Sequence, residues 1–175
     1  MMEDLSLHIL DIAENAAAAG ATRILIAVNE NEGRDRLTFR VSDNGRGMSA
    51  EEKARALDPF FTTGRKRTGL GLPLLAQTAE ICGGRLMISS EPGVGTRVSA
   101  VFPCSHVDRP PLTRMAETIM TLIFGHPAID FGYRHTRNGI TFSILRHSRG
   151  QVVRPAEIVA VKESLSRGLA RIGAS

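Results

Sequence analysis

The 175-residue sequence contains no tryptophan, one tyrosine and only two cysteines. Cys82 and Cys104 lack the spacing of a metal-binding or redox motif, so we expect two small apolar residues in a reducing compartment. No apolar run approaches the roughly 20 residues that span a membrane. The N-terminal residues also lack the basic and then apolar order of a signal peptide. We therefore expect a cytoplasmic protein with no membrane segment.

Acidic residues are scarce in the C-terminal part of the chain. The whole chain has a formal net charge of +4, and residues 105–175 contain ten Lys or Arg but five Asp or Glu. Twelve bases and thirteen acids remain elsewhere, a net charge of −1. The C-terminal arginines are scattered and do not alternate with aromatic residues in the pattern of a base-stacking surface, so nucleic acid is not an expected partner. A solvated surface or an acidic protein partner is favoured.

The stretch 41–48 follows a strand-like run and combines a carboxylate with two glycines. Residues 37–41 alternate between apolar and polar, which delivers Asp43 to the end of a strand. An Asp can accept a hydrogen bond from an exocyclic amine such as adenine N6, and Gly45 and Gly47 let the main chain approach a flat ligand. On its own, Asp-Asn-Gly is also turn chemistry that closes a hairpin.

Four further segments surround this stretch in a fixed order. They are residues 7–16, 58–63, 68–72 and 93–96. As a set, the segments resemble the Bergerat-type ATP-binding fold of histidine kinases, DNA gyrase, mismatch-repair proteins and the ninety-kilodalton heat-shock chaperones. The Phe-Phe-Thr-Thr and Gly-Leu-Gly-Leu sequences are most similar to the catalytic domain of histidine kinases. The resemblance covers about residues 3–103.

The resemblance implies an α/β two-layer sandwich, with helices on one face of a mixed, mainly antiparallel sheet. We expect an ATP-binding domain over residues 1–104, a proline-containing linker over residues 105–111 and a small α/β appendage of unknown role over residues 112–175. Periodicity and turn residues predict the individual elements. The helices are 4–19, 49–57, 74–82, 112–124 and 156–172, and the strands are 22–29, 37–41, 85–89, 96–102, 129–135 and 140–146.

Two residues of the first segment carry the expected chemistry. The resemblance implies that Asn15 holds Mg²⁺ against the ATP phosphates, as the matching Asn does in the family. Asp11 lies one helical turn earlier, where members that hydrolyse ATP carry a Glu that activates water and histidine kinases usually carry Asn. A carboxylate there can act as a general base, although Asp reaches roughly 1.5 Å less far than Glu. Asp11 is the catalytic candidate, with Glu14 as a rival carboxylate.

Residues 60–72 correspond to the lid of the family. Glycine amides and the start of a helix form an anion site there, and the basic run 65–67 places positive charge near the triphosphate. Thr96 can assist Asp43 at the adenine through its hydroxyl. The predicted nucleotide-binding residues are Asn15, Asp43, Gly45, Gly47, Phe60, Thr63, Lys66, Arg67, Thr68, Gly69, Leu70, Gly71, Leu72 and Thr96.

A histidine kinase needs a phosphoaccepting histidine on a helical hairpin before its ATP domain, and few residues precede the first segment here. We therefore expect a stand-alone module that binds ATP and Mg²⁺ and phosphorylates or switches a partner protein. The partner could be a response regulator, another phosphoacceptor or a redox-enzyme subunit. The alternatives are an ATP-sensing regulatory subunit with negligible turnover and a slow ATPase that uses Asp11. The sequence leaves open whether the protein forms a homodimer and which residue accepts the phosphoryl group.

Overall fold

The computed structural model describes residues 4–58, 71–148 and 153–174. Within these residues, a six-stranded sheet has the order β3-β4-β2-β1-β5-β6. Every neighbouring pair is antiparallel except β1 and β5. The elements are α1 (Leu5–Ala18), β1 (Arg23–Asn31), a 3-10 turn (Glu32–Arg34), β2 (Arg36–Asp43), α2 (Ala50–Arg55), α3 (Gly71–Ile81), β3 (Arg85–Glu91), β4 (Gly95–Phe102), α4 (Met115–Gly125), β5 (Asp130–Arg137), β6 (Ile140–Arg146) and α5 (Pro155–Ile172).

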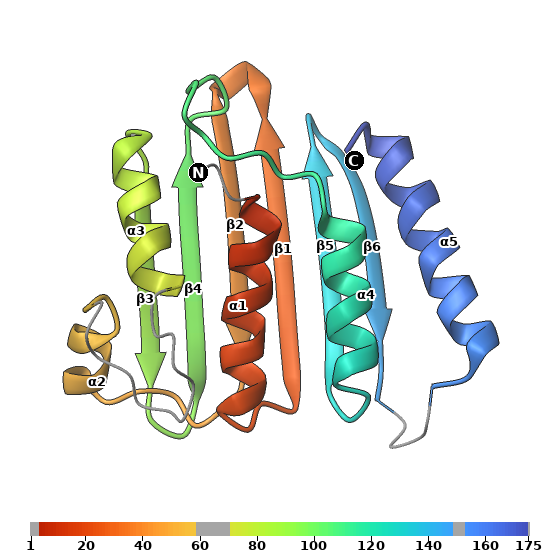
Figure 1. The fold of residues 1–175 in the computed structure, drawn as a ribbon, viewed down its shortest axis with the longest axis horizontal. Helices are drawn as coiled ribbons and strands as arrows, with labels where there is room; N and C mark the ends of the chain where they lie inside the picture. Colours follow the sequence, from red (N-terminus) through yellow and green to blue (C-terminus); the bar gives the residue numbers. More distant parts are fainter. Residues whose placement is uncertain (1–3, 59–70, 149–152, 175) are drawn as a thin grey trace.

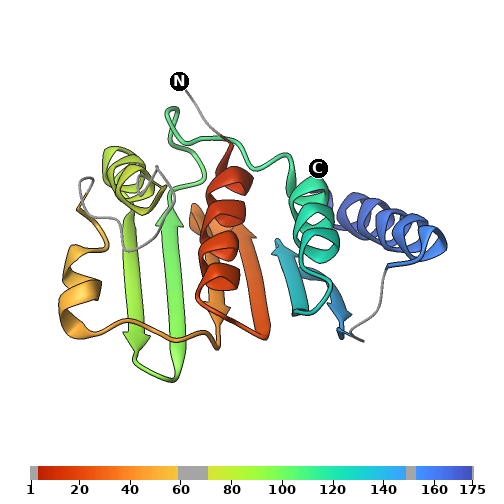
Figure 2. The same ribbon diagram turned by 60° about the horizontal axis from the view of Figure 1, so that its bottom comes forward.

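The helices α1, α3, α4 and α5 all lie on one face of this sheet (Figure 1). The turned view separates the two layers, and none of the described helices covers the opposite face of the strands (Figure 2). The predicted fold class, a two-layer sandwich with helices on one face of a mixed and mainly antiparallel sheet, is confirmed. In the described part of the chain, no helix is both long enough and apolar enough to cross a membrane.

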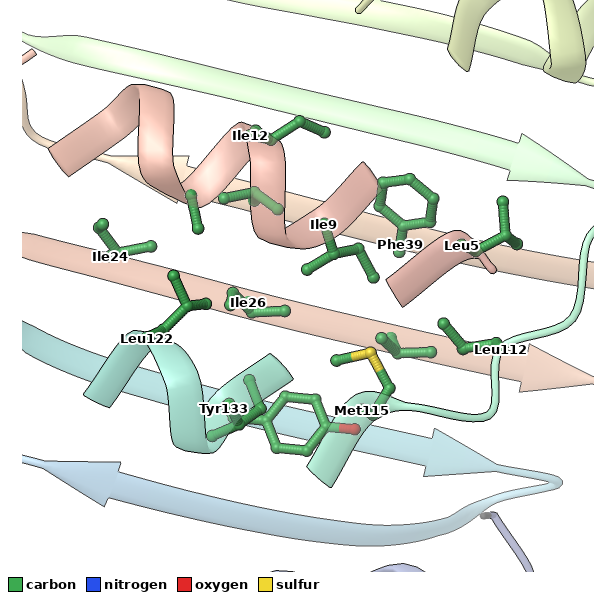
Figure 3. Close-up of a cluster of buried hydrophobic side chains, with 14 of the residues drawn as sticks. Leu5, Ile9, Ile12, Ile24, Ile26, Phe39, Leu112, Met115, Leu122 and Tyr133 are labelled. Carbon is green, nitrogen blue, oxygen red and sulfur yellow. The ribbon is translucent and has the colours of Figure 1, made fainter. Parts of the chain in front are cut away.

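Alternating burial along the central strands explains how the core forms. In β1, Ile24, Ile26 and Val28 are buried while the residues between them are exposed. This period of two is the pattern of a strand with one covered face. Ile9 and Ile12 belong to the apolar stripe of α1 and pack onto these strands, as the close-up of the core shows (Figure 3).

Two helices begin three residues away from their predicted starts. The structure starts α3 at Gly71, three residues before the predicted start at residue 74, and Pro73 falls in its first turn, where a missing N–H costs no helical hydrogen bond. The structure starts α4 at Met115 rather than residue 112. The later start has a local cause, because the Asp4 carboxylate accepts hydrogen bonds from the backbone N–H and the hydroxyl of Thr113.

The C-terminal part of the chain extends the same sheet and core. β5 runs parallel to β1, and Phe131 and Tyr133 are in register with Ile24 and Ile26. α1 packs on α4, and Leu122 of α4 is fully buried in the common core (Figure 3). The continuous sheet therefore ties residues 112–174 to the strands that precede them. The boundary at residues 105–111 remains a prediction.

Asp4 joins the start of α1 to the segment before α4. Its Oδ1 caps α1 by accepting the backbone N–H of Ser6 at 2.8 Å, and its Oδ2 accepts the N–H of Thr113 at 2.9 Å. Burial by itself would raise the pKa of Asp4, but the hydrogen bonds from Ser6 and Thr113 outweigh burial and hold the pKa below its usual value of 3.8. The carboxylate form therefore stabilises the folded state.

Replacing Asp4 with Asn should make the protein less stable at neutral pH and less sensitive to acid. A depressed pKa contributes stability above the unfolded value of 3.8, and this contribution is lost as the pH falls through the lower folded value. We expect the substitution to reduce the free energy of unfolding by about 1–2 kcal/mol at pH 7. Urea titrations at pH 7 and pH 3 measure both effects. An equal loss at the two pH values would contradict the assignment.

Candidate functional site

Asp43 ends β2 on the covered side of the sheet. Its backbone is in register with Ile24 of β1, and the preceding residue pairs with the start of β4. The side chain is half-buried, and its Oδ1 accepts the Gly45 N–H at 2.8 Å. Among the described residues, no donor is assigned to the second carboxylate oxygen. Asp43 thus fixes its own loop with one oxygen, and the other can accept a further hydrogen bond.

The loop after Asp43 is tied to two neighbouring elements. Asn44 accepts the backbone N–H groups of Thr22 and Arg23 at 2.9 and 2.8 Å. Its amide nitrogen donates to the Thr22 hydroxyl at 2.8 Å. The backbone N–H of Arg46 donates to the carbonyl of Ala19, just after α1, at 3.0 Å. The loop is therefore held in place before any ligand arrives. The sequence assigned no role to Asn44, whose partners lie 21 and 22 residues away.

Two glycines let the turn between β3 and β4 pack against the Asp43 loop. Gly47 has φ +66°, and a Cβ there would lie 2.0 Å from the Glu91 carbonyl oxygen. Gly95 has φ +134°, and a Cβ there would lie 2.0 Å from the Asp43 carbonyl oxygen. Both positions combine a backbone conformation that favours glycine with contact to another main chain. The start of β4 is thus held directly against Asp43.

A second hydroxyl accompanies Thr96 at this end of the sheet. Ser90 Oγ accepts the Met48 N–H at 2.8 Å and donates to the Gly95 carbonyl at 3.1 Å. It also lies 2.8 Å from Thr96 Oγ1. Because Ser90 gives its one hydroxyl proton to the Gly95 carbonyl, Thr96 donates to Ser90, and the Thr96 oxygen can accept a further hydrogen bond. Sequence reasoning missed Ser90, although extending the predicted hairpin by one pair places it opposite Thr96.

The other part of the candidate site lies along one row of α1. Asp11 and Asn15 are four residues apart, and Ala19 follows at the same interval, so all three share one side and span about 12 Å. At the first position, a Cβ on Gly71 would lie 1.8 Å from Asp11 Oδ2. At the last position, a Cβ on Gly45 would lie 3.1 Å from the Ala19 Cβ. Exposed Asn15 therefore stands between the start of α3 and the Asp43 loop.

Half of the predicted nucleotide-binding residues lie outside the ranges that the structure describes. Leu72 is described, and it is partly buried against the hydrophobic core. In the described ranges, no group of three or more His, Cys, Asp or Glu side chains could hold a metal ion. Mg²⁺ usually keeps waters and phosphate oxygens and needs only one or two protein oxygens, which Asn15 can supply. The predictions for Phe60, Thr63, Lys66, Arg67, Thr68, Gly69 and Leu70 fall outside the described residues.

Residues 3–106 match the family model described as "Histidine kinase-, DNA gyrase B-, and HSP90-like ATPase". The match covers more than half of the chain. The chain therefore belongs to this family of ATPases, which confirms the resemblance seen in the ordered sequence segments.

Several similar proteins are sensor kinases. The chain is 33% identical over 95 residues to the alginate biosynthesis sensor protein KinB of Pseudomonas aeruginosa, a match that covers 53% of this chain and 16% of KinB. It is 29% identical over 107 residues to the sensor histidine kinase ZraS of Escherichia coli O157:H7, covering 61% of this chain and 23% of ZraS. The chain thus spans less than a quarter of the length of these relatives.

Solved structures with low sequence identity share the fold. The Aquifex aeolicus MutL ATPase domain complexed with ADP has a TM-score of 0.57 and 15% identity, and the likeness covers 93% of this chain and 69% of that one. The N-terminal domain of a DNA repair protein has a TM-score of 0.60 and 16% identity, with coverage of 93% and 56%. Because 93% exceeds the family match, the shared fold includes much of the part after residue 106.

Proposed function

We propose that this chain binds ATP with Mg²⁺ and uses the nucleotide to phosphorylate or switch a partner protein. The observation that carries the proposal is the placement of Asp43. Its half-buried carboxylate has one oxygen committed to the loop and one available, beside a glycine-lined main chain and opposite the row of Asp11 and Asn15. Membership of an ATPase family supports the same assignment.

The chemistry of the site fits each part of the nucleotide. Asp43 would accept a hydrogen bond from the adenine amine, and Thr96 would add a hydroxyl beside it. The Gly45 N–H already donates to Asp43 and would not donate to the nucleotide. Gly45 and Gly47 would instead let the main chain lie close to the nucleotide. Asn15 would give Mg²⁺ one oxygen ligand. When bound, ATP supplies a transferable γ-phosphoryl group.

The remaining nucleotide contacts belong to the segment before α3 and to its first turn. We assign Phe60, Thr63, Lys66, Arg67, Thr68, Gly69, Leu70, Gly71 and Leu72 to this part of the proposed site. The support is the family match, which spans the segment, together with the position of Gly71 against Asp11. Basic side chains and unpaired helix N–H groups are suited to triphosphate.

Partner phosphorylation or switching is favoured over ATP hydrolysis by two observations. The similar protein ZraS is a sensor histidine kinase, and KinB is a sensor protein. Asp11 packs against the start of α3, where a Cβ on Gly71 would lie 1.8 Å from its Oδ2, and its side chain is shorter than the Glu of the members that hydrolyse ATP. A carboxylate shorter than Glu reaches less far toward an attacking water, which favours slow turnover at most. A response regulator, another phosphoacceptor or a redox-enzyme subunit would then receive the phosphoryl group or the conformational signal.

Purified protein incubated with γ-labelled ATP and Mg²⁺ tests these options. We expect ATP binding with slow release of free phosphate, and we expect Asp11→Asn to reduce that release about 100-fold or more, as for loss of a general base. Glu14→Gln is the matched control, because Glu14 contacts His126 at 3.0 Å instead of the start of α3. Label on an added phosphoacceptor protein supports transfer. Absence of both free phosphate and labelled protein supports ATP sensing. Fast release that survives Asp11→Asn would contradict the role of Asp11.

A further inference from the structure

The sheet face opposite the helices, called the open face here, carries an excess of arginine. It consists of the strand residues that alternate with the buried ones, and within the described ranges of the chain no helix lies over it (Figure 2). In the described strands, this face has two acidic residues, Asp130 and Glu91, both near one end of the sheet. Its basic residues are Arg23, Arg36, Arg40, Arg85, Arg97 and Arg134, and all six are exposed.

Most of this positive charge is not neutralised within the protein. Arg23 is in register with Asp130, but the other five arginines form no ion pair with any residue in the described ranges. Arg40 and Arg97 donate from Nε to Ser99 and Ser42 at 3.3 and 3.4 Å. These hydroxyls orient the guanidinium groups and leave their charge available to an anionic partner.

The strand register brings three of these arginines together. Arg40 pairs with Ala27 on β1, which pairs with Arg134 on β5, so the two arginines stand on either side of one strand at about 10 Å. Arg97 is a diagonal neighbour of Arg40 on β4, at about 7–8 Å. Like charges this close repel one another, and an acidic partner would relieve the repulsion.

Apolar side chains lie among the arginines. Leu25, Met87 and Leu145 are 46%, 44% and 60% exposed on the open face. Leu25 and Leu145 converge over Gly132, where a Cβ would lie 2.6 Å from one leucine and 3.5 Å from the other. A small residue at this position lets the two leucines form one apolar surface across three strands. Arginine, methionine and aliphatic contacts together are typical of protein interfaces.

We propose that the open face is a docking surface for an acidic protein partner. Single-stranded nucleic acid is disfavoured, because the aromatic residues of the strands, such as Phe39, Phe102 and Tyr133, are buried on the covered face and cannot stack on bases. A duplex offers phosphates to the arginines but little apolar surface to Leu25 and Leu145. An acidic protein surface with aliphatic side chains matches both features.

This surface is independent of the proposed nucleotide site, since Asp43 and Thr96 lie on the covered side of the strands. It also differs from the C-terminal basic segment, because five of the six arginines belong to residues 23–97. That region carries many acids, and the alternation of the strands sorts its arginines onto one face. Net charge along the sequence therefore conceals the basic surface.

The test uses a labelled synthetic peptide of alternating acidic and aliphatic residues at 150 mM salt. Arg40→Glu, Arg97→Glu and Arg134→Glu together should weaken binding at least tenfold. The control combines Arg34→Glu, Lys162→Glu and Arg167→Glu, which make the same change in charge at exposed positions away from this face and should alter affinity less than threefold. Charges more than about 8 Å from the peptide are screened at this salt concentration, so a difference between the variants locates the site.

Arg40→Gln, Arg97→Gln and Arg134→Gln together provide a milder variant if charge reversal impairs folding, which circular dichroism monitors. This variant should also weaken peptide binding while leaving MgATP binding unchanged. Equal effects of the open-face and control variants would overturn the proposal. Tighter binding of a duplex oligonucleotide than of the peptide at the same salt would also overturn it. Absence of ATP binding with the peptide result intact would reject the nucleotide proposal alone.

Discussion

Replacing Asp43 with alanine should weaken MgATP binding about tenfold to a hundredfold. The substitution removes a hydrogen bond to a charged acceptor, which contributes about 1.5–3 kcal/mol, and each 1.4 kcal/mol corresponds to a factor of ten in affinity. It also removes the acceptor of the Gly45 N–H, which loosens the main chain beside the nucleotide. Isothermal titration calorimetry with ATP and Mg²⁺ measures the loss.

Two control variants separate recognition from damage to the loop. Asp43→Asn keeps an oxygen for the Gly45 N–H but turns the other half of the side chain into a donor, which cannot accept from the adenine amine. We therefore expect normal thermal stability with weakened binding. Asp108→Ala removes an exposed carboxylate elsewhere and should leave affinity unchanged. If Asp43→Ala bound ATP as tightly as the unchanged protein, the proposed nucleotide site would be wrong.

Most of the fold was predictable because its signals are local. The apolar stripe of α1 and the alternation of β1 and β2 each lie within one element, and Asn138 and Gly139 supply the positive φ angles of the turn between β5 and β6. The parallel pairing of β5 with β1 was not predicted. Periodicity gives the covered face of a strand, but it does not say which distant strand lies beside it.

The candidate site also contains residues that could be predicted from the sequence and residues that could not. The ordered segments identified Asp43 and the Asp11 and Asn15 pair, because the resemblance depends on residue types at set spacings. The roles of Asn44 and Ser90 were not predicted, since each side chain accepts a hydrogen bond from a backbone N–H that is distant in sequence. A hydroxyl or amide in a turn has many local uses, and only the folded chain shows which one it takes. The basic open face was not predicted for a related reason, because its arginines come together only when the strands pair.

Replacing Gly47 with alanine should lower the free energy of unfolding by about 2–5 kcal/mol. The positive φ of +66° costs a residue with a Cβ about 1–2 kcal/mol. The new Cβ would also lie 2.0 Å from the Glu91 carbonyl oxygen, so the main chains of the loop and β3 must separate. Overpacking of this kind typically adds about 1–3 kcal/mol. Chemical denaturation measures the difference.

Gly93→Ala is the matched control for this substitution. Gly93 has φ +76° and lies in the same contact, with its N–H donating to the Arg46 carbonyl at 2.8 Å, but a Cβ there has no atom within 4 Å. The conformational cost is therefore similar and the steric cost is absent, which predicts a loss of only about 1–2 kcal/mol. Gly47→Ala should also impair MgATP binding, because the displaced main chain borders the Asp43 loop. Equal destabilisation by the two substitutions would show that backbone conformation, rather than close packing against β3, requires glycine at position 47.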